Sequence, residues 1–171
     1  LADIIRTDLE SAPRHIKHSQ DGNFSYVIHE LNNTIGVYSY KDTDNGPEFE
    51  RVQTISTVNS YHAGDTAACA IKLSADGKYV YCSNAGDNSV GAFKRNTTTG
   101  ELEKIFVLPI SGEYPKDIAI ADNNKFVIAL NNESSTITFF KMDLKEKTLI
   151  MNGPELKFKN GNCILLHKCE G

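Results

Sequence analysis

An all-β fold is predicted by three features of this sequence. β-Branched and aromatic residues alternate with polar ones along most of its 171 residues. The alternating runs have the length of strands, and Asp-Gly, Asn-Asn and other glycine-rich turns separate them. The pattern recurs twice, which indicates a single supersecondary unit present in about three copies.

The period of the repeat identifies the kind of unit. Ile16, Ile71 and Ile118 correspond in the three copies, at spacings of 55 and then 47 residues. These spacings are near the period of β-propeller blades, in which each repeat is one four-stranded sheet. Helical repeats of similar length do not share the alternating content. We therefore predict a partial β-propeller, with blades at about residues 13–58, 68–110 and 115–156.

Each blade is expected to hold four strands. In the first blade they lie near residues 14–19, 24–29, 34–40 and 49–56, with a hairpin turn at 20–23. In the second they lie near 69–74, 79–84, 89–95 and 101–108, and in the third near 116–121, 125–130, 136–142 and 147–151. Residues 162–167 are expected to form one more strand, and residues 3–9 either the outer strand of a preceding blade or a short helix.

Three blades with orphan strands form an open arc. Exposed sheet edges invite pairing, so we expect the missing part of the ring to come from a longer chain, a second chain or self-association. The formal charge of -4 argues against a surface for nucleic acid or an anionic membrane. No apolar run reaches the length of a bilayer span.

The cysteines indicate the compartment. They form no CxxC pair and no Cys/His cluster with zinc-ligand spacing, so we expect reduced thiols in a cytoplasmic protein and no metal site. These four cysteines are Cys69, Cys82, Cys163 and Cys169.

A candidate site follows from strand geometry. In an antiparallel blade the start of the first strand and the end of the second lie at the same end of the sheet. This places Arg14, His15 and Glu30 together at one mouth of the central channel. A guanidinium binds a carboxylate, a phosphate or an oxyanion, while an imidazole or a carboxylate beside it moves protons, and hydrolysis of an ester or lactone needs both. The alternative is that Arg14 and Glu30 form a structural ion pair.

The later copies place further polar residues at this mouth. We take Lys72, Lys116, Asp117 and Asn132 as candidate substrate-binding residues, with the lysines supplying positive potential for an anionic substrate. Solvated surface lysines are the alternative. His29 could serve the packing or the mouth. The other histidines are expected to be structural or loop residues: His18, His62 and His167.

Several motifs occur in a characteristic order, at residues 13–16, 33–38, 73–81, 112–117 and 162–166. Together they resemble the seven-bladed β-propeller lactonase family, typified by bacterial 6-phosphogluconolactonases. The resemblance implies the C-terminal half of such a ring, whose strand at 162–167 would join the first blade. It also implies hydrolysis of a sugar-acid lactone by activated water, without metal or other cofactor.

The resemblance assigns roles by position. Arg14 would bind the substrate anion or the oxyanion, and His15 or Glu30 would activate water. Ala85 and Lys116 depart from the family pattern, because arginine is common at both positions. A non-catalytic propeller that binds a ligand or a protein is therefore the alternative function.

Overall fold

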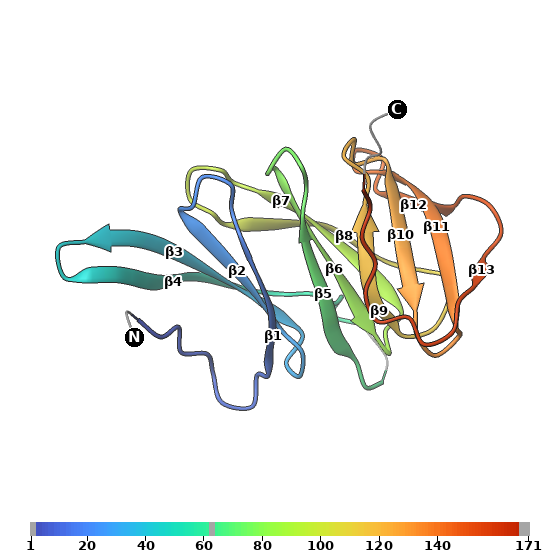
Figure 1. Cartoon of the computed structure of the whole chain (residues 1–171), viewed down its shortest axis with the longest axis horizontal. Coiled ribbons are helices and arrows are strands. Elements are labelled where there is room, and N and C mark those ends of the chain that lie inside the picture. The colour runs from blue at the N-terminus through green and yellow to red at the C-terminus, as the bar shows by residue number, and fades with distance from the viewer. Residues whose placement is uncertain (1–2, 62–63, 168–171) are drawn as a thin grey trace.

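The computed structural model describes residues 3–61 and 64–167 of the chain. Within them, three four-stranded antiparallel sheets stand side by side (Figure 1). The first strand of each sheet is the innermost one, and the inner strands of adjacent sheets are neighbours. The predicted fold class, a partial β-propeller, is confirmed.

The strands follow the chain from the inner to the outer edge of each sheet. The first sheet holds β1 (Pro13–His18), β2 (Phe24–His29), β3 (Thr34–Thr43) and β4 (Gly46–Ser56). The second holds β5 (Ala67–Leu73), β6 (Tyr79–Ala85), β7 (Ser89–Arg95) and β8 (Leu102–Pro109). The third holds β9 (Pro115–Ile120), β10 (Phe126–Asn131), β11 (Thr136–Asp143) and β12 (Thr148–Met151), and the short β13 (Leu156–Lys157) also pairs with β11.

A serine and an aspartate shape the turn between the first two strands of a sheet. Ser19 Oγ donates to Asp21 Oδ1 at 2.5 Å and accepts the Phe24 N–H at 3.0 Å. Ser74 and Asp76 form the same pair in the second copy, at 2.6 Å. Such side-chain bonds to a turn's own backbone favour a tight reversal over a continued strand. The recurring Ser-x-Asp-Gly sequence thus yields the same hairpin in the first two sheets.

Two apolar cores fill the spaces between sheets, one between the first and second and one between the second and third. The first core contains Phe24, Tyr26, Ile28, Ile35, Val37, Ala68, Ile71, Val80, Cys82, Phe93 and Leu102. The second contains Ala70, Tyr81, Val90, Ala92, Phe106, Ile118, Val127, Ala129, Phe140 and Met142. The middle sheet is therefore buried on both faces, because successive side chains along its strands point to opposite sides.

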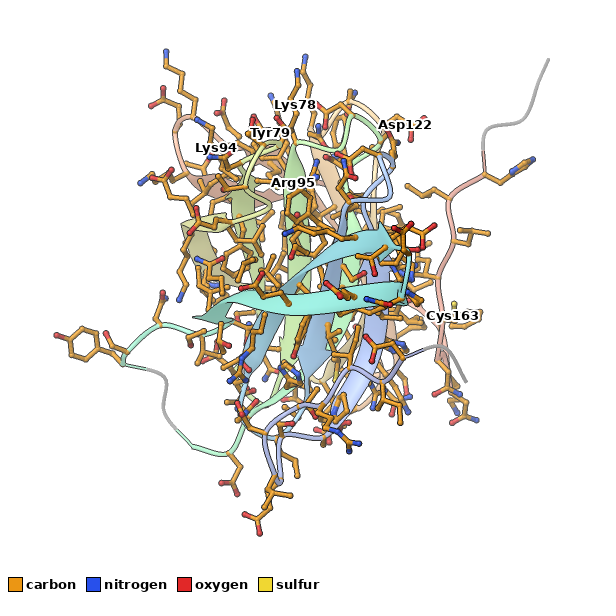
Figure 2. All side chains as sticks on the ribbon, turned by 90° about the vertical axis from the view of Figure 1, so that its left-hand side faces the viewer. Lys78, Tyr79, Lys94, Arg95, Asp122 and Cys163 are labelled. Carbon is orange, nitrogen blue, oxygen red and sulfur yellow. The ribbon has the colours of Figure 1, made fainter. Side chains whose placement is uncertain are left out.

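Arg95 joins the first two sheets. Its side chain is 3% exposed, and its Nη2 lies 3.1 Å from Asp21 Oδ2 in the turn of the first sheet. Its Nε donates to the Tyr26 hydroxyl at 2.6 Å, and its Nη1 to the Gly77 carbonyl at 3.2 Å. The guanidinium also lies over the Phe24 ring, 5.4 Å from its centre. Figure 2 shows Arg95 among the side chains between the sheets.

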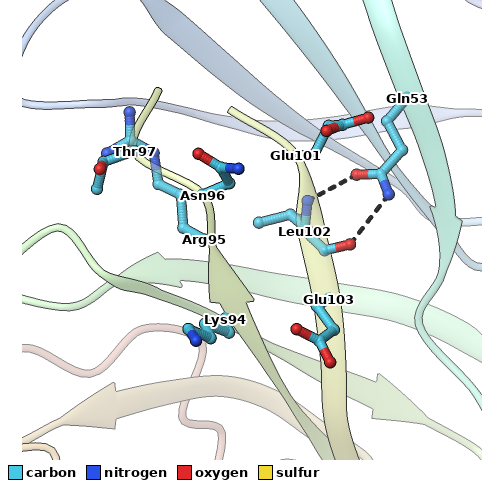
Figure 3. Close-up of a pocket in the computed structure, with 8 residues that line it drawn as sticks. All are labelled: Gln53, Lys94, Arg95, Asn96, Thr97, Glu101, Leu102 and Glu103. Carbon is cyan, nitrogen blue, oxygen red and sulfur yellow. Dashed lines mark hydrogen bonds between the residues drawn. The ribbon is translucent and has the colours of Figure 1, made fainter. Parts of the chain in front are cut away.

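A polar cavity of about 600 Å³ lies beside this contact, at the outer part of the two sheets. Gln53 of β4 crosses to the second sheet and bonds both backbone groups of Leu102, accepting its N–H at 2.8 Å and donating to its carbonyl at 3.0 Å (Figure 3). The Gln53 side chain thus makes the pair of backbone hydrogen bonds that a neighbouring strand would make. None of the predicted site residues lines this cavity, so we assign it to the packing of the sheets.

Two terminal predictions are wrong. Residues 162–167 form no strand, and residues 3–9 form neither a strand nor a helix. A strand needs an edge to pair with, and the sheets to which these segments would belong are not among the described residues. The described part of the chain contains no helix that could cross a membrane.

Arg95→Ala should lower the free energy of unfolding by about 2–4 kcal/mol, because it removes three hydrogen bonds, two of which join the first two sheets. The partial exposure of Asp21 limits the loss. Lys94→Ala, at the exposed neighbouring position, is the matched control and should change stability by less than about 0.5 kcal/mol. Urea unfolding measures both. Equal effects of the two substitutions would contradict the role of Arg95.

Candidate functional site

Arg14 of β1 and Glu30, just after β2, lie together and form an ion pair, the contact that both the catalytic and the structural interpretation predict. Arg14 Nη1 donates to Glu30 Oε2 at 2.9 Å, and each side chain is 27% exposed. Burial disfavours the charge of Arg14, but the hydrogen bond to Glu30 and nearby acidic groups outweigh it and raise the pKa of Arg14. Arg14 Nε is buried without a hydrogen-bond partner among the described residues. The guanidinium is thus held by Glu30 on one side only.

A β-bulge explains why Arg14 leaves the ladder. The pairing of β1 with β2 skips from Pro13 to His15, so Arg14 is the extra residue. The third sheet repeats this irregularity between Pro115 and Asp117, where Lys116 is extra. A bulge bends the strand and redirects a side chain, and bulges are frequent beside functional sites.

The second sheet has its bulge at the equivalent place. Its register shifts between Ala68 and Ile71, and Cys69 lies in the shifted segment. Cys69 is fully buried, and the charges of Arg14, Glu30 and Lys116 act electrostatically on its thiol. Burial is the largest cause that raises the pKa of Cys69, so the thiol is neutral at physiological pH. The three inner strands therefore present an arginine, a thiol and a lysine at equivalent positions.

Tyr114 is a mouth residue that sequence reasoning did not select. It precedes β9 with a φ of 59°. Its N–H donates to Asn88 Oδ1 at 2.8 Å, and its carbonyl accepts the Asn132 N–H at 2.9 Å. Burial first, then the charges of Cys69 and Glu30, raise the pKa of its hydroxyl. Tyr114 precedes the proline that begins the inner strand β9, just as Ala12 precedes Pro13 at the start of β1. This equivalent position in the repeat is the sequence signal that points to Tyr114.

His15 follows Arg14 on β1 (Pro13–His18). A cavity of about 230 Å³ adjoins it, lined by Ile5, Thr7, Pro13, Arg14, His15, Ile16 and Val27. His15 is exposed overall, yet desolvation of its ring and then the positive charge of Arg14 lower its pKa. Asp117 and Lys72 also act on this imidazole electrostatically, with opposite signs. The imidazole is therefore neutral at neutral pH.

Lys72 and Asp117 form an ion pair between the inner strands of the second and third sheets. Lys72 Nζ lies 2.8 Å from Asp117 Oδ1, with the carboxylate side chain 10% exposed. Asp117 Oδ1 also accepts the Ile118 N–H at 2.9 Å, and Oδ2 accepts the Ile164 N–H at 3.0 Å. The aspartate thus ties the C-terminal segment to the inner edge of the third sheet.

Other predicted residues have structural roles or lie outside the site. Asn132 Nδ2 donates to the Gly161 carbonyl at 3.0 Å, which holds the C-terminal segment. His29 is buried, with its Nδ1 3.1 Å from Thr34 Oγ1, and burial lowers its pKa. His18 and His167 are exposed. His62 lies outside the described residues. The described ranges contain no group of three or more His, Cys, Asp or Glu residues arranged to hold a metal ion.

Comparison with known proteins identifies the fold and its relatives. A family model described as lactonase, seven-bladed β-propeller, matches residues 2–166. An uncharacterized protein of Lactococcus lactis is 32% identical over 165 residues, which cover 96% of this chain and 48% of that protein. The chain spans about half the length of the curated relatives it matches.

The solved structures that this chain resembles are also about twice its length. A Lactobacillus plantarum protein is 26% identical with a TM-score of 0.84, over 95% of this chain and 47% of the other. A Bacteroides uniformis protein, provisionally designated a 6-phosphogluconolactonase, is 30% identical with a TM-score of 0.77, over 92% of this chain and 44% of the other. These coverages are consistent with the expected half of a ring.

Asp117→Ala should release the C-terminal segment without unfolding the sheets. It removes the acceptor of the Ile164 N–H, and a hydrogen bond to a charged group contributes about 1.5–3 kcal/mol. We expect amide exchange at Ile164 to accelerate at least about tenfold, while amides of β10 keep their protection. Asp122→Ala, at an exposed position near the same strand, is the control. Unchanged exchange at Ile164 in the Asp117 variant would refute this role.

Proposed function

We propose a function from one premise: this chain belongs to the seven-bladed β-propeller lactonase family. The function is hydrolysis of a sugar-acid lactone, typically a phosphorylated one, at the mouth formed by the inner strands. The observation that supports it is the half-buried Arg14–Glu30 pair with the neutral His15 beside it. Because the chain spans about half the length of its relatives, the proposal concerns the groups that this half contributes.

His15 is the proposed general base. Lactone hydrolysis requires water to attack the carbonyl carbon, a base to accept the proton of that water, and an acid to protonate the ring oxygen as it leaves. A neutral imidazole can accept the first proton and return it to the leaving oxygen. The positive charge of Arg14 keeps His15 in this neutral form by lowering its pKa, in addition to the effect of desolvation.

Arg14 is the proposed partner of the oxyanion. Glu30 binds Nη1, which fixes the orientation of the planar guanidinium. The buried Nε, without a partner in the described part of the chain, is a donor that a carbonyl oxygen could receive as its charge develops. Lys116, redirected by its bulge and half-buried, is the proposed contact for the anionic group of the substrate.

The ion pairs of Arg14 with Glu30 and of Lys72 with Asp117 favour a second function. Lys72 is bound by Asp117, and Arg14 by Glu30, so much of the positive charge at the channel is already neutralised. Such a mouth can bind an anionic ligand weakly without turning it over. A non-catalytic binding module is therefore the alternative, and the experiments below separate the two.

The thiols bear on where this reaction takes place. Cys69, Cys82 and Cys163 are free, with the first two buried and the third exposed. Free thiols are typical of a reducing compartment. We therefore propose that the chain acts in the cytoplasm.

The 171-residue chain should hydrolyse 6-phosphogluconolactone above the spontaneous rate, and Arg14→Ala should reduce kcat/KM by about 10²–10³-fold because an oxyanion donor is lost. Lys17→Ala, on the same strand and exposed, is the charge-matched control and should retain activity. A rate equal to the spontaneous one would refute the catalytic proposal for this chain. Calorimetric binding of 6-phosphogluconate without turnover would then support the binding module.

The acid side of the pH–rate profile should report His15. Its lowered pKa means that kcat/KM stays constant as the pH falls from 7 and decreases only below the ordinary histidine value of 6.5. His15→Asn should reduce the rate and remove this limb. A limb that persists in the His15→Asn variant would assign the base to another group.

A further inference from the structure

Tyr114 lies at a position that recurs in all three sheets, at the start of the inner strand. The carbonyls of Tyr114 and Ala12 accept the N–H of the residue that follows the second strand of their sheet, at 2.9 Å and 2.8 Å. In the second sheet Ala67 pairs with the last residue of β6 at the same place. The first two sheets thus have alanine where the third has tyrosine, so the fold itself does not require a large side chain there.

The backbone of Tyr114 has a conformation that suits a large side chain poorly. Its φ of 59° lies in the left-handed region, which bulky residues rarely adopt. Two hydrogen bonds hold it there, from its N–H to Asn88 Oδ1 at 2.8 Å and from the Asn132 N–H to its carbonyl. Ala12 has a similar φ of 50°, so the scaffold imposes this conformation. Strained residues that the surrounding structure holds in place cluster at ligand contacts.

The inner strands bring Tyr114 to the Arg14–Glu30 pair. β5 contacts both β1 and β9, and the Glu30 carbonyl accepts the Ala68 N–H of β5 at 3.1 Å. Next to Ala68 is Cys69, the buried thiol on which Arg14 and Glu30 act electrostatically. The hydroxyl of Tyr114 interacts electrostatically with Cys69, Glu30 and Arg14. Three consecutive inner strands therefore place a guanidinium, a buried thiol and a phenol in one cluster.

The phenol of Tyr114 is available as a hydrogen-bond donor. Tyr114 is half-buried, and its hydroxyl makes no hydrogen bond to any residue that the structure describes. The oxygen is not among the buried polar atoms without a partner, so solvent reaches it. Burial and the nearby acidic groups raise the pKa of the hydroxyl, which therefore keeps its proton at neutral pH. A neutral phenol in this position can donate to a bound ligand.

We propose that Tyr114 is a specificity-determining contact, whose hydroxyl donates a hydrogen bond to a ring hydroxyl of the lactone. This inference rests on the proposed function. Arg14 and Lys116 are the proposed contacts for the carbonyl oxygen and the anionic group, which leaves the hydroxylated ring as the part of the substrate without a contact. A tyrosine combines an apolar face with one polar group, and this suits a ring that presents both C–H groups and hydroxyls.

Tyr114→Phe should raise the KM for 6-phosphogluconolactone about 3–10-fold, the effect of one lost hydrogen bond, and change kcat by less than about twofold. A ring hydroxyl is bound equally in the ground state and the transition state, so its contact affects KM alone. The unfolding midpoint should not change, because phenylalanine keeps the ring. Tyr40→Phe is the matched control: its ring packs against Phe49 in the outer part of the first sheet, and its KM should be unaltered.

Binding of 6-phosphogluconate separates this contact from catalysis. In a nuclear magnetic resonance spectrum of the chain with isotope-labelled tyrosine rings, the Tyr114 signal is the one missing from Tyr114→Phe. The ligand should shift that signal, and Tyr114→Phe should weaken calorimetric binding about 3–10-fold. Both effects without turnover would refute lactone hydrolysis and support the Tyr114 contact. Turnover with an unshifted Tyr114 signal and an unchanged KM in Tyr114→Phe would overturn the contact alone, and absence of any binding would overturn both.

Discussion

A four-stranded sheet with apolar residues on both faces is stable only when both faces are covered, and this requirement governs the whole chain. The second sheet meets it completely, with one core on each side. The first sheet has one face on a core and part of the other under the segment before β1, with Ile16 on that face 42% exposed. The third has one face on a core and only part of the other under the C-terminal segment. The irregular ends of the chain are thus coverings for sheets, which is why they need no regular structure.

The same requirement separates the parts of the repeat that must recur from those that are free to vary. Positions inside a core recur as apolar residues, as at Ile35 of β3 and Val90 of β7. The bulge at the start of the inner strand recurs as a backbone feature, but its side chain differs: Arg14, Cys69 and Lys116. A bulged residue contributes no pair to the ladder, so the fold does not select its chemistry. The mouth of the channel is therefore where one repeated scaffold can carry different functional groups.

Much of the fold could be predicted from sequence because its determinants are local. Alternation, Asp-Gly turns and the repeat period set the strands and their grouping, and adjacent strands alone bring Arg14 to Glu30. The rest depends on contacts between sheets. The partners of Lys72 and Asn132 come from the third sheet and from the C-terminal segment, and no spacing in the sequence encodes them. The expected strand at 162–167 is absent for a related reason, because its sequence has strand character but the sheet that it would join is not among the described residues.

Asp117 takes part both in holding the segment that covers the third sheet and in the electrostatics of the candidate site. Its carboxylate binds Lys72 of the second sheet, Ile118 of its own strand and Ile164 of the segment that lies over the third sheet. Through electrostatics it also opposes the effect of Arg14 on His15. A change in the covering of the third sheet that moves this carboxylate away would therefore lower the pKa of the proposed base on the first sheet further. The open end of the arc and the candidate site are physically connected through a single buried side chain.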